Sequence, residues 1–287
     1  MEKHDKKIEK SNQSEIITVK LYTEDDIFED EGFQGISTGI CSVLGTRKSQ
    51  QDSVFAEFNG ERGIAIVCDG MGGLQGGEIA SQTAVQILAN DFFLEGEILD
   101  IQEFLCQEAY KTDQEVGNLC DENGMSLECG TTLVSIIIDK GRLYWLSVGD
   151  SKIYFIRDHE IICLNRLHNY RMTMDDMLSQ GQISMEEYCE KETQAEALIS
   201  FVGMRNLSLM DVGPKGGLEL KDNDIILLTS DGLYRLLTDN DIIEIVKRNM
   251  FDMQKAAKAL INEAAMRVTG SQDNTSVAII RYQEEIK

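Results

Sequence analysis

Four aspartates lie at or beside the ends of short apolar runs that read as β-strands, each next to glycine or a polar residue. They are Asp69, Asp150, Asp231 and Asp273. An ionised carboxylate at the end of a buried strand is costly unless something compensates its charge. Asp-Gly is also an ordinary turn dipeptide, so each aspartate taken alone is better explained as a turn residue. Four in the same context favour a shared site.

Strand ends at one edge of a sandwich converge, and converging carboxylates must be neutralised. A pair of divalent cations does this, and a two-metal site activates water between the ions. Asp52, directly before the predicted strand 53–58, is a candidate fifth carboxylate. The pattern predicts a hydrolytic metal centre.

The glycine-rich stretch 69–78 runs directly into a predicted helix. A phosphate-binding loop needs Gly-Lys-Ser/Thr at its end, where this chain has Gly77-Glu78-Ile79, and a dinucleotide fingerprint needs glycine where Gln75 stands. Both nucleotide sites are excluded. The glycines permit tight backbone packing and the close approach of a backbone carbonyl to a metal.

Other chemistries have less support in the sequence. The three histidines lack the spacing of a zinc site, and no Gly-x-Ser-x-Gly motif is present. The seven cysteines are widely spaced and odd in number, which indicates small buried side chains in a reducing compartment. We therefore expect a cytoplasmic protein.

The charge balance restricts the partners. The chain has 27 basic and 50 acidic residues in 287, a net charge of −23. Nucleic acid and anionic membrane surfaces repel such a molecule, and no apolar segment is long enough to span a bilayer. We expect a monomer that binds neither.

Periodicity predicts an α+β fold. Residues 1–34 form a polar, acidic N-terminal tail, and residues 35–287 form one catalytic domain. Alternating runs predict strands at 53–58, 63–68, 132–138, 143–148, 153–156, 161–164, 225–228 and 275–281, and Asp139–Gly141 reads as a hairpin turn. Helical spacing is clear at 78–93, 101–119, 238–246 and 255–266. Strands in meanders with helices in pairs favour antiparallel sheets, and the stretch from Asn165 reads as irregular.

Seven motifs, in order, resemble those of the metal-dependent protein phosphatases of the 2C type. The resemblance covers roughly residues 36–283, and Met71 in place of histidine is typical of the bacterial branch. The motifs are RKSQQD (47–52), VCDGMGG (67–73), GEIAS (77–81), CGTT (129–132), VGDSKIY (148–154), TSDGL (229–233) and DNTS (273–276).

The resemblance implies a four-layer α-β-β-α sandwich of two antiparallel sheets flanked by helix pairs. It implies two Mn²⁺ or Mg²⁺ ions and hydrolysis of phosphoserine and phosphothreonine in proteins phosphorylated by a serine/threonine kinase. The implied metal ligands are Asp69, the Gly70 carbonyl, Asp231 and Asp273, with Asp52 holding metal-bound water and Asp150 at a third metal position. Arg47 would bind the phosphoryl group as a bidentate fork.

The chain departs from the family pattern at two places. Gln50 stands where the family usually has asparagine, which we expect to loosen Asp52. Arg166–Asn169 falls where an Asp-His-Ser signature commonly precedes the flap, here about residues 165–212. This flap holds six of the 12 methionines. We interpret them as gap-filling in a small subdomain rather than as an adaptable binding surface.

Two other functions fit the same residues. A catalytically weak relative that binds phosphoproteins as a regulator would explain Gln50 and the altered flap. A metal-dependent hydrolase of small phosphate esters would need the same carboxylates. The retention of Arg47, Asp52, Asp69, Asp231 and Asp273 favours the protein phosphatase over the regulator.

Overall fold

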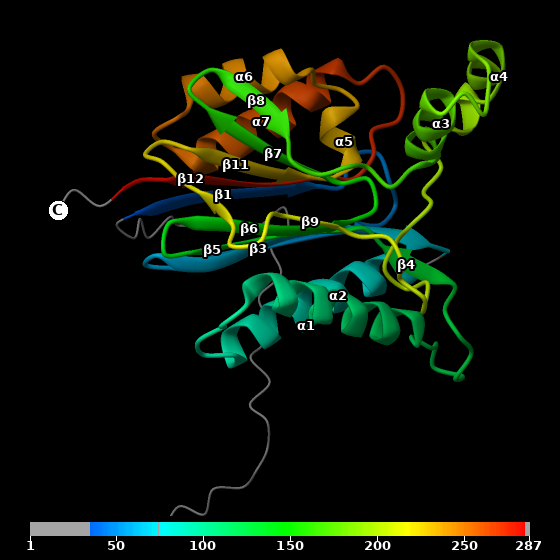
Figure 1. Ribbon diagram of the computed structural model, residues 1–287, viewed down its shortest axis with the longest axis horizontal. Coiled ribbons are helices and arrows are strands. Elements are labelled where there is room, and N and C mark those ends of the chain that lie inside the picture. Colours follow the sequence, from blue (N-terminus) through cyan, green and yellow to red (C-terminus); the bar gives the residue numbers. More distant parts are fainter. Residues whose placement is uncertain (1–34, 74, 285–287) are drawn as a thin grey trace, which may run out of the picture.

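The computed structural model describes residues 35–73 and 75–284, so the predicted tail at 1–34 lies outside the described residues. Two antiparallel sheets pack face to face, and helices cover both outer faces (Figure 1). The predicted four-layer α+β sandwich is confirmed. Among the described residues, none of the helices is long and apolar enough to cross a membrane.

One sheet has five strands in the order β1-β12-β11-β7-β8, which are Ile36–Val43, Thr275–Tyr282, Ile225–Thr229, Lys152–Arg157 and Glu160–Cys163. The other has the path β10-β6-β5-β3-β2, which are Leu218–Glu219, Arg142–Val148, Leu133–Asp139, Arg62–Gly72 and Asp52–Asn59. Two short strands complete it: β4 (Cys129–Thr131) pairs with β3, and β9 (Asp211–Val212) pairs with β6.

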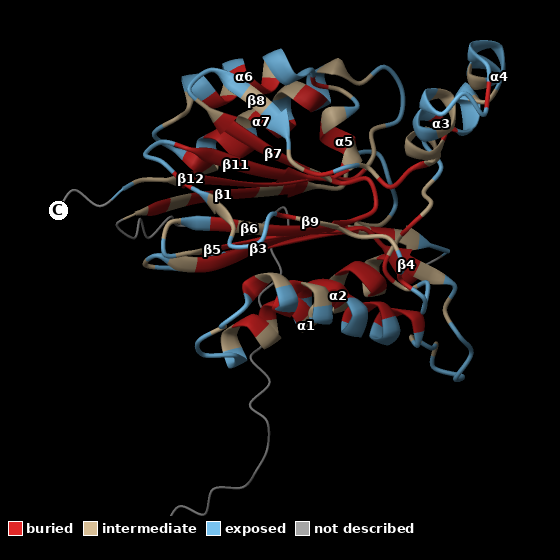
Figure 2. Ribbon diagram, viewed as in Figure 1, coloured by how far each residue is buried: buried red, intermediate tan, exposed pale blue. Residues whose placement is uncertain are grey.

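Alternation along the strands separates the two faces of each sheet. On β3, Ile64, Ile66 and Cys68 face the core beneath the helices, whereas Ala65 and Val67 face the core between the sheets. Figure 2 shows that the central strands are buried. Because both of their faces are covered, the residues of these strands are mostly apolar. The ends of these strands are therefore where polar side chains can gather.

Helix pairs cover the outer faces. On the seven-stranded sheet lie α1 (Gly76–Leu94) and α2 (Ile101–Gly117). On the five-stranded sheet lie α6 (Asp239–Arg248) and α7 (Met253–Arg267). The one-turn helix α5 (Asp231–Tyr234) follows the end of β11. The predicted capping box at Thr238 and Asp241 is present, and Lys140 and Gly141 have the positive φ of 49° and 72° that a tight hairpin requires.

The sequence predicted an irregular stretch from Asn165, and this prediction is wrong. The stretch contains α3 (Tyr170–Ser179), α4 (Met185–Glu190) and the 3₁₀ turn η1 (Glu192–Gln194). Asn169 caps α3, and Ser184 with Glu187 forms a capping box on α4. The helices enclose a small separate core of Met174, Ile183 and Ala195. So few buried positions leave little apolar periodicity to detect.

Candidate active site

Asp52 and Asp69 lie opposite each other in neighbouring strands. Asp52 begins β2, Asp69 lies near the end of β3, and the two are direct partners in the antiparallel register. The backbone of Asp69 is held by Thr132, whose Oγ1 accepts from the Asp69 amide at 2.9 Å and whose amide donates to the Asp69 carbonyl at 2.8 Å. The seven-stranded sheet therefore supplies this carboxylate pair.

Asp231 and Asp273 come from the other sheet. Asp231 begins α5 just after β11, and Asp273 lies two residues before β12. Ser230, the neighbour of Asp231, donates its hydroxyl to Asp52 Oδ2 at 2.7 Å. This bond joins the two sheets at the carboxylate end.

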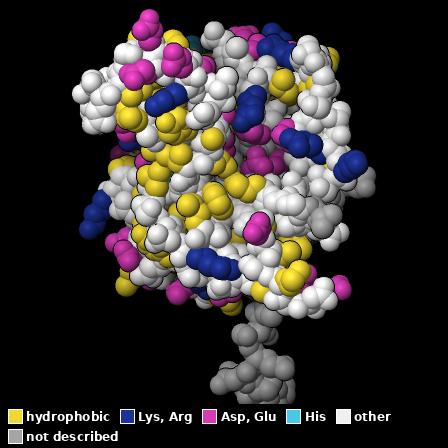
Figure 3. Space-filling model, turned by 90° about the vertical axis from the view of Figure 1, so that its right-hand side faces the viewer, with side chains coloured by type: hydrophobic (Ala, Val, Ile, Leu, Met, Phe, Trp, Pro, Cys, Tyr) yellow, Lys and Arg dark blue, Asp and Glu magenta, His cyan; other side chains and the backbone are white. Residues whose placement is uncertain are grey.

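Asp150 lies in the connection from β6 to β7, which crosses from one sheet to the other. Arg235 relates it to Asp231, since one guanidinium nitrogen lies 2.9 Å from Asp231 Oδ2 and 4.0 Å from Asp150 Oδ2. Figure 3 shows acidic side chains near the centre of this face, with basic side chains around them. The structure thus brings all five predicted aspartates to one end of the sandwich.

Gly70 lets β3 approach the first turn of α1 closely beside these carboxylates. Its amide donates to the Gln51 carbonyl at 3.0 Å, and a Cβ at this position would lie 2.0 Å from the Gly77 carbonyl oxygen. No other residue fits there without moving the start of α1. The tight packing predicted from the glycine-rich stretch is present, whereas metal binding by the Gly70 carbonyl stays a prediction.

The electrostatics show an excess of negative charge. Burial raises the pKa of Asp52 to about 7 and that of Asp150 to about 6, with neighbouring carboxylates adding to both shifts. Burial, followed by the charges of Asp52 and Asp231, raises the pKa of Asp69 well above its usual range. Burial also raises the pKa of Asp231, although Arg235 opposes the shift. These four carboxylates thus resist ionisation in the absence of further cations.

The donor set fits hard divalent cations. Among the described residues, two arginines, Arg47 and Arg235, pair with these five aspartates, so the carboxylates outnumber their basic partners by three. The buried Oδ1 atoms of Asp52 and Asp231 have no hydrogen-bond partner. Carboxylate oxygens are the ligands that Mg²⁺ and Mn²⁺ prefer. In residues 35–73 and 75–284, however, no three acidic, histidine or cysteine side chains are already arranged around one point.

Arg47 lies at the rim of the carboxylate group. Its side chain is 56% exposed, and Nη2 lies 2.5 Å from Asp273 Oδ2. The hydrogen bond to Asp273, together with the charge of that carboxylate, raises the pKa of Arg47 above its usual value. Arg47 is therefore a permanently charged, accessible cation beside the carboxylates, as phosphate binding would require.

Gln50 supports Asp52 rather than loosening it. Its Oε1 accepts from the Asp52 amide at 3.1 Å, and its Nε2 donates to Ser42 Oγ at 3.0 Å. Ser42 shares a 2.7 Å hydrogen bond with Ser276, whose amide donates to Ser230 Oγ at 3.0 Å. The longer amide of glutamine thus joins a polar chain that ends on Asp52, and nothing in this geometry supports the expected loosening.

Sequence reasoning missed the roles of Arg235 and Ser230. Arg235 stands four residues after Asp231, the spacing at which opposite charges meet on a helix, but α5 is a single turn and was not predicted. The altered flap signature also makes a contact beside Asp150. His168 is buried, and its Nδ1 accepts from the Gly149 amide at 3.1 Å, which fixes the backbone beside Asp150.

Comparisons with known proteins agree with this geometry. Residues 42–269 match the family model for protein phosphatase 2C. The serine/threonine phosphatase stp of Listeria monocytogenes is 30% identical over 228 residues, which is 76% of this chain and 83% of that protein. The protein phosphatase PhpP of Streptococcus pneumoniae is 28% identical over 252 residues, which is 86% of this chain and 97% of that protein.

Solved structures show the same fold. The serine/threonine phosphatase of S. agalactiae superposes with a TM-score of 0.71 at 25% identity, over 87% of this chain and all of that one. The catalytic domain of the phosphatase PstP, solved with two manganese ions, has a TM-score of 0.70 at 24% identity, over 87% of this chain and 99% of that one. With the carboxylate site in place, the chain belongs to the protein phosphatase 2C family of metal-dependent serine/threonine protein phosphatases.

Proposed function

We propose that Asp69, Asp231, Asp273 and the Gly70 carbonyl hold two Mn²⁺ or Mg²⁺ ions, and that the enzyme hydrolyses phosphoserine and phosphothreonine in proteins. One observation carries the proposal: five aspartates from both sheets converge, and within the described part of the chain their ion-pair partners are two arginines. When bound, the ions would activate water and neutralise charge on the phosphoryl group.

Asp52 would orient the attacking water. Ser230 donates to Asp52 Oδ2, which leaves the buried Oδ1 to accept a hydrogen bond from that water. Gln50 holds the Asp52 backbone in register for this role. Asp52 therefore acts as an orienting acceptor.

Arg47 would bind two oxygens of the phosphoryl group. In the structure it pairs with Asp273, so a cation bound by Asp273 would free the guanidinium for substrate. Charge that develops on the phosphoryl oxygens would then be stabilised by a fixed, bidentate donor. We assign Asp150, with Arg235 beside it, to a weaker third metal position.

The cellular setting is also a proposal. Cysteines without a tight pair suit the cytoplasm, and the charge of −23 suits neither nucleic acid nor membrane partners. We infer a monomer whose substrates are products of a serine/threonine kinase. The negative surface favours phosphosites in basic or neutral sequence contexts.

The test is hydrolysis of a phosphothreonine peptide and of p-nitrophenyl phosphate, with Mn²⁺ and with chelator. We expect turnover that depends on Mn²⁺ and a loss of about 10³-fold or more in Asp231→Asn. Unchanged turnover in that variant would reject the metal assignment. Tight Mn²⁺ binding by calorimetry without turnover would instead identify a phosphoprotein-binding regulator. Turnover restricted to small esters would identify a different hydrolase.

A further inference from the structure

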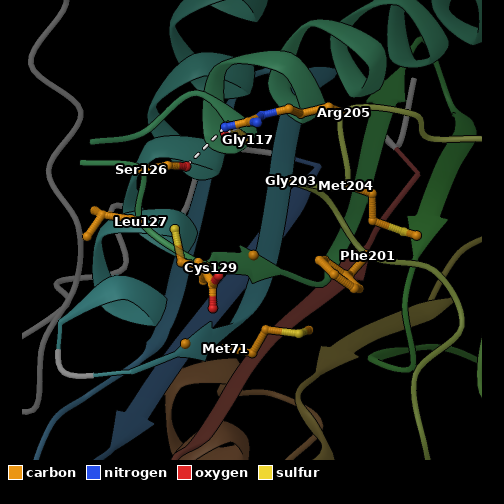
Figure 4. A pocket seen from close by; sticks show the side chains of 12 residues that line it. Met71, Gly117, Ser126, Leu127, Cys129, Phe201, Gly203, Met204 and Arg205 are labelled. Carbon is orange, nitrogen blue, oxygen red and sulfur yellow. Dashed lines mark hydrogen bonds between the residues drawn. The ribbon is translucent and has the colours of Figure 1, made fainter. Parts of the chain in front are cut away.

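A cavity opens between the end of β3 that carries Asp69, the loop from α2 to β4, and flap residues 201–205. It has a volume of about 520 Å³. Its apolar lining comes from three segments: Met71 of β3, Leu127 and Cys129 before and at the start of β4, and Phe201 and Met204 of the flap. In Figure 4, Met71, Phe201 and Met204 lie on one side, Leu127 and Cys129 on the other, and Arg205 crosses the top.

The walls of this pocket are fixed by a buried carboxylate on α2. Asp113 accepts hydrogen bonds from the backbone amides of Gly203 at 2.8 Å, Arg205 at 3.2 Å and Leu207 at 3.1 Å. Arg205 in turn donates from Nε to the Gly117 carbonyl at 2.6 Å and from Nη2 to Ser126 Oγ at 3.1 Å. These bonds hold the flap segment against α2, so the pocket is formed before anything binds.

The flap segment is also tied to the strand that carries Asp69. Val202 exchanges two backbone hydrogen bonds with Thr131, of 2.9 and 2.8 Å, and β4 pairs with the end of β3. Met71 lies two residues beyond Asp69, a separation of about 7 Å along a strand. An extended peptide covers the same distance in two residues. A substrate whose phosphorylated residue lies at Asp69 would therefore reach the pocket with a side chain two or three residues away.

The charge of the pocket differs from that of the catalytic end. Its lining includes a single acidic residue, Glu128, and a single basic residue, Arg205, whereas five aspartates gather next to it. The volume is that of an ordinary ligand pocket, and methionine side chains adapt to apolar groups of varied shape. An uncharged, apolar group is the occupant that this lining suits.

We propose that the pocket binds an apolar side chain, such as leucine, methionine or phenylalanine, two or three residues from the phosphorylated residue of the substrate. The proposal rests on the proposed function and adds a sequence preference to it. Met204 and Leu127 act here as specificity residues that contact the substrate peptide rather than the phosphate. The exposed Met204 thus has a binding role, unlike the buried Met174, which fills the small flap core.

The experiment compares phosphothreonine peptides that are identical except for phenylalanine or alanine two and three residues on either side of the phosphothreonine. For the wild-type protein with Mn²⁺, we expect a kcat/KM about ten-fold higher for phenylalanine at one of these positions, mainly through KM. Hydrolysis of p-nitrophenyl phosphate, which is too small to reach the pocket, provides the reference rate for every variant.

Two variants place a charge in the pocket, Met204→Glu and Leu127→Glu. We expect both to lose the phenylalanine preference. The matched control is Met266→Glu on α7, where the same change is made at a methionine that is 75% exposed and outside the pocket. It should keep the preference and the reference rate. Thermal unfolding of each variant verifies that it folds.

Equal kcat/KM for all peptides in the wild type, or a preference that survives both pocket variants, would overturn the pocket proposal while leaving the phosphatase assignment intact. Failure to hydrolyse any phosphopeptide or p-nitrophenyl phosphate would instead overturn the proposed function. A dimer in analytical ultracentrifugation that dissociates in Met204→Glu would assign the pocket to a second copy of the chain.

Discussion

An aspartate lies beside each end of strand β11, and the two aspartates have opposite surroundings. Asp224, before the strand, accepts from Arg157 Nε at 2.8 Å, from Arg157 Nη2 at 2.5 Å and from the Lys221 amide at 2.7 Å. Asp231, after the strand, pairs with Arg235 through Oδ2. Its buried Oδ1 accepts no hydrogen bond from the described residues. One carboxylate is satisfied by the protein and the other is not.

Strand β7 repeats the contrast, because it ends at Arg157 and is preceded by Asp150. At one end of the sandwich a carboxylate and a guanidinium match, and at the other the carboxylates outnumber the arginines. A buried ion pair is a structural feature, whereas uncompensated buried charge indicates a site for an external cation. Aspartates with similar sequence contexts can thus be assigned to a structural or a metal-binding role by the partners that the fold gives them.

The sharpest test of this contrast is Asp69→Asn. We expect activity to fall by about 10³-fold or more, because a charged metal ligand is lost. In chelator the same variant should unfold at a higher temperature than the wild type, because one of several repelling charges is removed. Asp158→Asn, at an exposed turn of positive φ that asparagine tolerates, is the control and should change neither quantity. A lower unfolding temperature for Asp69→Asn in chelator would contradict the charge-excess argument.

The opposite end should respond in the opposite sense. Asp224→Asn leaves Arg157 without its buried counter-charge, and we expect a loss of about 3 kcal/mol in the free energy of unfolding. Activity per folded molecule should be retained at temperatures where the variant is folded. Urea unfolding with a parallel phosphatase assay measures both. If Asp224→Asn lost activity while keeping its stability, the division between the two ends would be wrong.

The stability of the metal-free protein should fall as pH rises from about 4 to about 7. Burial raises the pKa of Asp52 to about 7, from an unfolded value of about 3.9, so over this window the folded state binds more protons than the unfolded state. Urea unfolding in chelator across this range measures the slope. Asp52→Asn should flatten it, and Mn²⁺ should remove it by supplying the missing positive charge. A metal-free protein that becomes more stable as pH rises would contradict the predicted direction of this pH dependence.

The smallest effect should come from Gln50→Ala. The change removes the acceptor of the Asp52 amide and the donor to Ser42 without removing a charge. We expect kcat to fall about three- to ten-fold with KM for Mn²⁺ raised, because Asp52 is less well held. Gln180→Ala in the exposed cap of α3 is the matched control. A Gln50→Ala enzyme with wild-type kinetics would show that the polar chain is not needed to position Asp52.

The sequence predicted the parts of this molecule that follow from periodicity. Buried strands alternate or run continuously apolar, so their ends, and hence the positions of Asp52, Asp69, Asp231 and Asp273, could be located in advance. Convergence of those ends followed from the antiparallel sandwich. The pattern itself predicted a shared metal centre, whereas the individual role of each residue came from the family resemblance, and these assignments stay predictions.

The contacts that depend on docking could not be predicted. Asp113 lies in a correctly predicted helix, yet its three amide partners belong to a flap segment some 90 residues away. Ser230 reaches Asp52 across 178 positions in sequence. A serine or an aspartate in isolation carries no signal of such a partner, because its hydrogen-bonding capacity is equally satisfied by solvent.

The bond from Ser230 to Asp52 joins strands of different sheets, and the candidate ligands divide the same way, with Asp69 in one sheet and Asp231 and Asp273 beside the other. Ions held by these residues would link the two sheets at this end through a contact that is lost when the metal dissociates. The end at Arg157 and Asp224 is closed permanently by the protein's own charges. Bound metal would then stabilise the catalytic end more than the opposite end, so the metal-free protein should open locally at the catalytic end first.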